Sequence, residues 1–287
     1  MASVAARLAR HGEPDRLHLQ HGPIDLVLDY RGEIDAVERA YCLAVERFEP
    51  VLAELVEELA SLRSETVPYR AFSGAVAQRM QRATAAVPTD SFVTPMAAVA
   101  GAVADEVLAA SWVSGLSRAS VNNGGDIAVR LTAGESFRLR VCDLANRPLA
   151  DFALTYDDGV AGVATSGAGG RSLSLGIADA VTVLAPTAAD ADVAATLIAN
   201  AVDIPGCERI VRMPASERDP DSDLGDRFVV TQCGVLRHDE VARALERGAR
   251  CAEVWRQRGL ITSAALFLRG QHRIIGQDHT LNLPTAG

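Results

Sequence analysis

The residues best suited to chemistry lie between positions 162 and 196, where a Gly/Ser-rich loop precedes an apolar strand and a helix. Residues 165–172 contain three glycines, two serines and Arg171. The backbone amides of such a loop can surround an anion, and an arginine can add a charge-assisted hydrogen bond. The loop matches neither the P-loop nor the dinucleotide pattern. A phosphate site and an ordinary surface loop therefore both fit its composition.

Asp192 and Thr196 follow this loop, four residues apart in a segment with helical character. That spacing places a carboxylate and a hydroxyl on one face of a helix. Mg²⁺ typically binds one or two carboxylates together with hydroxyl, carbonyl and phosphate oxygens. Asp190 is explained equally well by its favourable interaction with the helix N-terminus. The pair Asp192 and Thr196 therefore predicts a metal site beside the Gly/Ser-rich loop.

A third candidate is the run Asn123, Gly124, Gly125 and Asp126 between two apolar segments. The glycines would let a ligand approach the backbone, and the aspartate could bind ribose hydroxyls, a ring or a metal. An Asn-Gly-Gly-Asp run is also an ordinary hairpin turn, which accounts for every residue in it. The sequence leaves both interpretations open.

Other polar clusters give weaker signals. Asp221, Asp223 and Asp226 resemble part of a calcium loop but lack its closing glutamate, so a solvated loop is the simpler interpretation. The five cysteines form no CxxC pair, and the six histidines show no metal-ligand spacing. Reduced thiols in a cytosolic protein are the expected state.

The composition limits the class of partner. The chain has 287 residues, 48% of them hydrophobic, and a formal net charge of -9. A nucleic-acid surface needs clustered basic side chains, so nucleic acid is not expected as a partner. No apolar run is long enough to span a bilayer, and the first twelve residues do not form a secretory core. We expect a cytoplasmic protein with no membrane partner.

Hydrophobic spacing predicts how these residues are positioned. A strand is expected at 22–30, a helix at 33–63 with a kink or break near Glu49 caused by Pro50, and a weaker helix at 70–86. Thr94 and Pro95 predict the start of an uncharged, buried helix. Asp105 follows this apolar stretch and needs a partner, a metal or water. The uncharged segment could alternatively form a subunit interface.

The second half predicts mixed β-structure and helices. Residues 127–131 and 137–141 are expected to form a hairpin, with further strands at 152–165 and 178–185. Thr187 and Asp190 form a capping-box-like start for a helix that ends at Val202. A polar loop at 214–226, a strand at 227–232, a helix at 239–258 and a strand at 264–269 follow. The order predicts an α+β fold whose mixed, largely antiparallel sheet packs against helices.

Four blocks in order resemble the ApbE-like superfamily, whose best known members are FAD:protein FMN transferases. Residues 98–105 resemble its "GIAKGYAVD" helix, and residues 121–127 its "VNxGGDI" turn. Residues 163–167 resemble "xATSG", and residues 180–196 resemble "SVTVxAxTAxxADAxxT". The resemblance is strongest to an uncharacterised cytoplasmic branch, over roughly residues 15–270. It implies a single domain over 1–287, with an N-terminal strand and long helices at 20–90, core motifs at 92–205 and a C-terminal subdomain at 206–270.

The resemblance also implies a site. Asp192, Thr196 and a main-chain carbonyl near Val99 would bind Mg²⁺. The implied flavin-binding residues are Asn123, Gly124, Gly125, Asp126, Thr165, Ser166, Gly167, Gly170, Arg171 and Ser172. The implied cofactors are Mg²⁺ and FAD or FMN.

The chain departs from the family pattern at two places. The lysine of "AKG" is Ala100, and residues 168–177 lack the histidine of the family's "HIIDP" loop. We therefore expect a protein that binds a flavin or another phosphate-bearing nucleotide with Mg²⁺, with flavin or phosphoryl transfer as the implied reaction. The alternative is a non-catalytic cofactor-binding or partner protein in sulfur assimilation or pterin-dependent one-carbon metabolism. A homodimer is compatible with either.

Overall fold

A computed structural model describes the chain except for residues 1–3, 11–12, 88–90, 143–147, 169–172 and 277–287. The chain divides into two compact units. The first unit comprises Met1–Phe137, Leu154–Ala164 and Ala185–Asp192. The second comprises Arg138–Ala153, Thr165–Leu184 and Val193–Gly287, and it includes the predicted subdomain at 206–270.

The first unit is built on an antiparallel sheet. Its strands are β1 (Val4–Arg10), β2 (Glu13–His21), β3 (Ile24–Gly32), β4 (Leu116–Asn123), β5 (Asp126–Leu131) and the first part of β8 (Gly162–Ser166), paired in that order. Every second residue of β3 from Ile24 to Tyr30 is buried. This alternation fixes which face of the sheet packs on the core, because successive strand side chains point to opposite faces.

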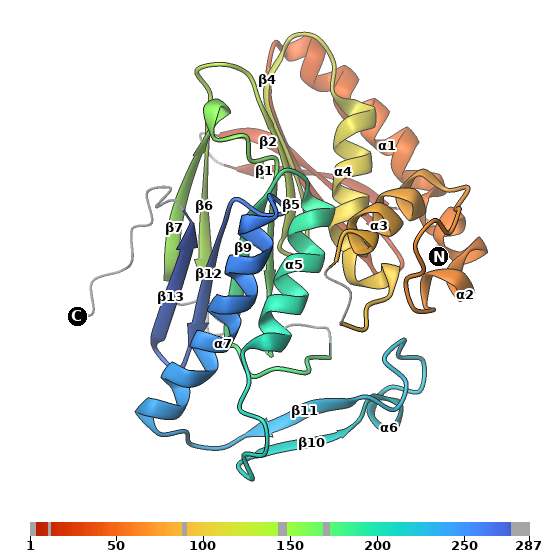
Figure 1. Ribbon diagram of the computed structural model, residues 1–287. Helices are drawn as coiled ribbons and strands as arrows, with labels where there is room; N and C mark the ends of the chain where they lie inside the picture. The colour runs from red at the N-terminus through yellow and green to blue at the C-terminus, as the bar shows by residue number, and fades with distance from the viewer. Residues whose placement is uncertain (1–3, 11–12, 88–90, 143–147, 169–172, 277–287) are drawn as a thin grey trace. The chain divides into compact units, whose positions relative to one another are not determined.

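Helices cover the buried face of this sheet. They are α1 (Ile34–Glu57), α2 (Leu59–Leu62), α3 (Ala75–Ala85) and α4 (Val99–Ser111), with short 3-10 turns η1 (Pro95–Ala98) and η2 (Tyr156–Asp158). In Figure 1, α4 stands between α1 and the strands, in agreement with its contacts to α1, β4 and β5. The predicted break in the first helix is wrong, because α1 continues through Pro50.

The apolar character of α4 reflects this central position. Ala102, Val103 and Ala104 have no exposed surface, and Gly101 is also buried. A helix that is apolar all round is stable when it is surrounded by protein. Packing inside their own unit therefore accounts for these apolar side chains without a subunit interface. Pro95 opens η1 as predicted, although the Thr94 side chain makes no capping hydrogen bond there.

In the second unit, β12 (Ser263–Leu268) lies between β9 (Ala180–Ala185) and β13 (Gln271–Gly276) and is antiparallel to both. Both β9 and β12 are buried along their whole length. Helix α7 (His238–Gln257) packs on β12 and β13 (Figure 1). Helix α5 (Ala188–Ala201) begins in the first unit and continues into the second.

Two separate strand pairs complete the secondary structure. β10 (Ile210–Pro214) pairs with β11 (Phe228–Cys233), and α6 (Ala215–Arg218) follows β10. β6 (Ser136–Cys142) pairs with β7 (Pro148–Thr155). The predicted hairpin of 127–131 with 137–141 is therefore wrong. Both edges of β5 are already used, by β4 and β8, and an alternating pattern cannot specify a partner.

The mixed, largely antiparallel α+β fold is confirmed, and the predicted strands at 22–30, 178–185, 227–232 and 264–269 are present within a few residues. β1, β2, β10 and β13 were not predicted. In the described part of the chain, no helix is both long enough and apolar enough to cross a membrane.

Candidate functional site

The start of α5 lies against α4 in the first unit. The backbone amide of Gly101 donates a hydrogen bond to Oδ2 of Asp192 at 3.0 Å. In return, the Asp105 side chain on α4 accepts hydrogen bonds from the amides of Ala188 at 3.0 Å and Ala189 at 2.9 Å. These amides would otherwise lack partners at the beginning of the helix. The partner that Asp105 requires is therefore the N-terminus of α5.

Two glycines permit this close packing. A Cβ atom at Gly101 would lie 2.2 Å from the carbonyl oxygen of Ala188. A Cβ atom at Gly162 would lie 2.1 Å from the carbonyl carbon and oxygen of Thr187. Any larger side chain at either position would separate α4 or β8 from the start of α5. The position of Asp192 relative to α4 thus depends on residues without side chains.

The predicted capping box at the start of α5 is also present. The amide of Asp190 donates to Thr187 Oγ1 at 3.1 Å, and the Thr187 hydroxyl donates to Asp190 Oδ2 at 2.6 Å. Asp190 is used in capping the helix, which supports its structural interpretation.

The Asn-Gly-Gly-Asp run forms the tight turn between β4 and β5. Asn123 and Asp126 are paired across the two strands, and Gly124 and Gly125 have φ of 66° and 117°. The amide of Gly125 donates to Asn122 Oδ1 at 2.8 Å, and the buried Asn123 side chain donates to the carbonyl of Ala100 at 3.1 Å. The turn requires both glycines, and Asn123 joins it to the first turn of α4.

The electrostatics of this region are unfavourable for a second ionised carboxylate. Loss of solvent around the carboxylate raises the pKa of Asp192 well above its usual value, and repulsion from Asp126 raises it further. The amides of Gly101 and Ala100 oppose this only in part. We refer to Asp126 and Asp192 as the carboxylate pair. At neutral pH a cation that bound there would relieve both causes.

Asp105 lies in a better compensated environment. Burial raises its pKa to about 6, while hydrogen bonds from Ala189 and Ala188 and the charge of Arg79 lower it. Its two oxygens are both used by the α5 amides. Asp105 therefore has a structural role in this geometry.

The donor atoms suit a hard metal ion held by few protein ligands. Within the described ranges, no group of three or more His, Cys, Asp or Glu residues is placed to hold a metal ion. The carboxylates of Asp126 and Asp192 are two candidate oxygen ligands, and Val99 begins α4 one turn before Val103. Mg²⁺ commonly takes one or two carboxylates and completes its shell with water and phosphate oxygens. The residues present fit that pattern.

The remaining predicted residues belong to the second unit or lie outside the described residues. Thr196 follows Asp192 by one turn of α5. The Thr165 hydroxyl hydrogen bonds to that of Thr182 at 2.9 Å, and a Cβ atom at Gly167 would lie 2.5 Å from the carbonyl oxygen of Asp179. Ser166 ends β8 between them. Gly170, Arg171 and Ser172 lie outside the described residues. Convergence of these residues with the carboxylate pair remains a prediction.

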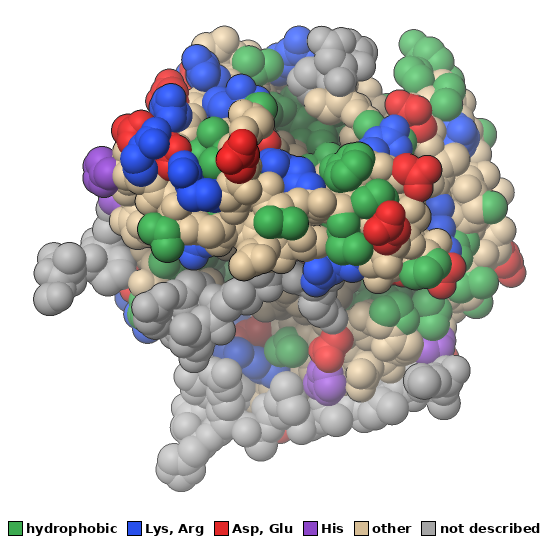
Figure 2. All heavy atoms as spheres, turned by 90° about the horizontal axis from the view of Figure 1, so that it is seen from below, with side chains coloured by type: hydrophobic (Ala, Val, Ile, Leu, Met, Phe, Trp, Pro, Cys, Tyr) green, Lys and Arg blue, Asp and Glu red, His purple; other side chains and the backbone are tan. Residues whose placement is uncertain are grey.

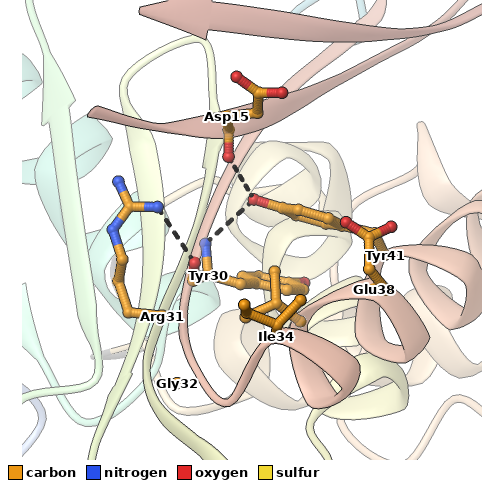
Figure 3. A pocket seen from close by; sticks show the side chains of 8 residues that line it. Asp15, Tyr30, Arg31, Gly32, Ile34, Glu38 and Tyr41 are labelled. Carbon is orange, nitrogen blue, oxygen red and sulfur yellow. Dashed lines mark hydrogen bonds between the residues drawn. The ribbon is translucent and has the colours of Figure 1, made fainter. Parts of the chain in front are cut away.

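A pocket of about 420 Å³ lies elsewhere in the first unit, where β3 meets the start of α1. In Figure 3, the Tyr41 hydroxyl donates to the carbonyl of Asp15 and accepts a hydrogen bond from the amide of Tyr30. Arg31 contacts the carbonyl of Tyr30, and it also pairs with Asp29 at 2.8 Å. The polar groups of Tyr30, Arg31 and Tyr41 in its wall are thus engaged in contacts within the protein, so we do not assign it a ligand.

The polar loop at 214–226, which carries Asp221, Asp223 and Asp226, shows no arrangement of carboxylates comparable to the carboxylate pair. Asp226 accepts a hydrogen bond from the hydroxyl of Ser216 at 2.7 Å, and Asp219 accepts one from the amide of Asp221 at 3.1 Å.

The contacts of Asp105 and Gly101, by contrast, are central to the site and were not predicted as such. Their signal in the sequence is a carboxylate and a glycine, four residues apart, within an otherwise alanine- and valine-rich helix.

Comparisons with known proteins place the chain in a family. A UPF0280 protein of Methanopyrus kandleri is 45% identical over 137 residues, which cover 47% of this chain and 53% of the relative. A UPF0280 protein of Methanoculleus marisnigri is 35% identical over 181 residues, covering 62% of this chain and 70% of the relative. The chain thus spans about half the length of the first of these relatives.

Solved structures give a weaker likeness. The apo form of the flavinyl transferase ApbE from Pseudomonas stutzeri aligns with 98% of this chain and 96% of its own, at 13% identity and a TM-score of 0.41. A point mutant of the flavin transferase ApbE from Vibrio cholerae aligns with 97% and 98%, at 14% identity and a TM-score of 0.43. The family model described as AbpE bacteria matches residues 5–274, and the chain therefore belongs to that family.

Proposed function

We propose that the protein binds Mg²⁺ through the carboxylate pair and, through that ion, a phosphate-bearing nucleotide for which FAD and FMN are the first candidates. The observation that carries the proposal is the half-buried carboxylate of Asp192, which accepts a hydrogen bond from the amide of Gly101 and is repelled by Asp126. Such a carboxylate favours cation binding, because its desolvation free energy is already included in the free energy of folding and does not oppose binding again.

Each residue would have a distinct role. Asp192 would contact the ion directly, and Asp126 would contribute a second oxygen from the β4–β5 turn. The carbonyl of Val99 and the hydroxyl of Thr196 are further ligands implied by the resemblance. Mg²⁺ bound there would neutralise charge on the phosphate oxygens of the ligand. Asn123 would hold the first turn of α4 in place through the carbonyl of Ala100.

The nucleotide part of the proposal depends on the sequence motifs and on family membership. Residues 165–172 would surround the phosphates with backbone amides, and Arg171 would add a positive charge. Ala100 replaces the family's lysine, and residues 168–177 contain no histidine. We therefore propose ligand binding as the primary function, with flavin or phosphoryl transfer as the activity to test.

Binding of Mn²⁺, used in place of Mg²⁺ and followed by electron paramagnetic resonance of the free ion, tests the metal site. D192N should weaken binding at least about tenfold, since it removes a charged ligand from an enclosed site. D126N should weaken it less. D157N is the matched control, because Asp157 is an exposed aspartate in the same unit. Equal affinities of D192N and the wild type would exclude the site.

Titration of the wild-type protein with FAD and FMN, with Mg²⁺ and with a chelator, tests the nucleotide. Affinity that depends on Mg²⁺ and is lost in D192N supports the proposal, whereas affinity unaffected by chelation contradicts it. Release of AMP or FMN from FAD over time would then distinguish turnover from binding.

A further inference from the structure

The outward face of α7 carries a row of arginines. Arg243, Arg247, Arg250 and Arg258 are all exposed, and Val254 lies in the same row with 43% of its surface exposed. Their spacings of three and four residues place them on one side of the helix and its C-cap. We call this set the arginine stripe.

The charges of the stripe are not neutralised where they stand. Across the part of the chain that the structure describes, Arg247, Arg250 and Arg258 form no ion pair, and Arg243 contacts Asp239 only at 3.4 Å. Arg256 points elsewhere and pairs with Glu253 at 2.7 Å. Like charges three and four residues apart destabilise a helix, and among the described residues only the pair of Arg243 with Asp239 offsets that cost.

The outward face of α1 carries the opposite charge. Asp35, Glu46, Glu49 and Glu57 are exposed and lie along one side of this helix, with Ala53 between them and Val56 58% exposed beside them. Arg39 is also exposed on this side, and it donates a hydrogen bond to the carbonyl of Ser114 at 3.3 Å. We call these four carboxylates the acidic stripe. None of the four forms an ion pair with any residue that the structure describes.

We propose that the arginine stripe of one copy of this protein docks on the acidic stripe of a second copy. Both stripes are helical, and each has an exposed valine beside its charges. Arg243 and Arg258 are about 22 Å apart along the helix axis, at about 1.5 Å per residue. The acidic stripe is longer, so the whole arginine stripe can lie on it.

The distribution of charge favours this pairing of copies over a pairing with nucleic acid. The first unit contains 22 Asp and Glu against 12 Arg, while the second contains 15 against 16. A polyanion would be attracted by the arginine stripe but repelled by the net charge of -9. Figure 2 shows basic and acidic side chains side by side on the face drawn there.

The expected association is weak and depends strongly on salt. Each exposed ion pair contributes little, and salt screens such pairs beyond about 10 Å at 0.1 M ionic strength. Sedimentation velocity of the full chain should therefore show concentration-dependent self-association at low ionic strength. The association should disappear in about 0.5 M salt, where the screening length is shorter still.

Charge reversal tests the two faces separately. R247E/R250E and E46R/E49R should each weaken self-association at least tenfold, because each places like charges opposite one another. The variant that carries all four changes should recover association, since the complementary pattern is restored with its signs exchanged. R256Q changes an arginine of the same helix outside the stripe and should have no effect.

The proposal is overturned if the protein stays monomeric at high protein concentration and low ionic strength. It is also overturned if R247E/R250E associates as strongly as the wild type, or if the fourfold variant does not recover association. Circular dichroism melts of every variant guard against loss of folding, and all substituted positions are exposed. Capture of a short RNA duplex by a wild-type protein that stays monomeric would assign the stripe to polyanions and would likewise refute self-docking.

Discussion

Two carboxylates on either side of the α4–α5 contact differ in how their burial is compensated. Asp105 accepts hydrogen bonds from two helix-terminal amides and is attracted by Arg79, and its pKa rises only to about 6. Burial raises the pKa of Asp192 well above its usual value, repulsion from Asp126 adds to this, and the amides of Gly101 and Ala100 oppose it. This difference explains why Asp105 completes the N-terminus of α5, and it is the reason for proposing Asp192 as the cation ligand.

The largest effect is expected when the contact itself is broken. G101A places a methyl group 2.2 Å from the carbonyl oxygen of Ala188, so α4 and α5 must separate. We expect a loss of about 3 kcal/mol in the free energy of unfolding. Urea denaturation would measure it, and G234A, whose added Cβ would make only ordinary contacts of 3.4 Å or more, is the control. A loss below about 1 kcal/mol would show that α4 and α5 adjust to the added methyl group while keeping their hydrogen bonds to Asp105 and Asp192.

The raised pKa of Asp105 predicts the next largest effect. A carboxylate whose pKa is higher in the folded than in the unfolded state stabilises the fold most below the unfolded value. That contribution is lost as pH rises through the folded value, here between about 4 and about 6. A shift of this size corresponds to about 2–3 kcal/mol.

Urea melts from pH 4 to pH 7.5 would show this loss, and D105N should flatten it over the same range. The same substitution should lower stability at pH 5, because a carboxamide cannot accept hydrogen bonds from both Ala188 and Ala189. If D105N left the pH profile unchanged, the titration would belong to another group.

D192N tests the other side of the comparison. Removal of a repelled charge should raise the stability of the metal-free protein by about 1 kcal/mol at neutral pH. The stabilisation that Mg²⁺ gives the wild-type protein should disappear in the same variant. Thermal melts with Mg²⁺ and with a chelator would show both changes. If D192N is less stable than the wild type when both are free of metal, Asp192 has a structural role, as Asp105 does.

Sequence patterns singled out Asp192 and Asp126 as separate candidates, but they predicted neither their pairing nor the contacts that hold them. Asp192, Asp126 and the capping box of Thr187 and Asp190 could be identified from residue types and spacing, since each belongs to a local motif. The close approach of Gly101 to Ala188 could not, because it joins residues far apart in the chain. The failed pairing of 127–131 with 137–141 has the same cause, since strand periodicity fixes a face but not a neighbour.

A substitution at Gly125 separates the two interpretations of the Asn-Gly-Gly-Asp turn. Gly125 has φ of 117°, and a Cβ atom built there meets nothing within 4 Å. G125A should therefore cost about 1–2 kcal/mol through backbone strain alone. If a flavin or nucleotide lies against this turn, the added methyl group should also lower its affinity measurably, as followed by flavin fluorescence. G134A, at another open glycine of positive φ in the same unit, should reproduce the strain without the loss of affinity. Equal affinities of G125A and G134A would show that the glycines serve the turn and that the ligand approaches Asp126 from another side.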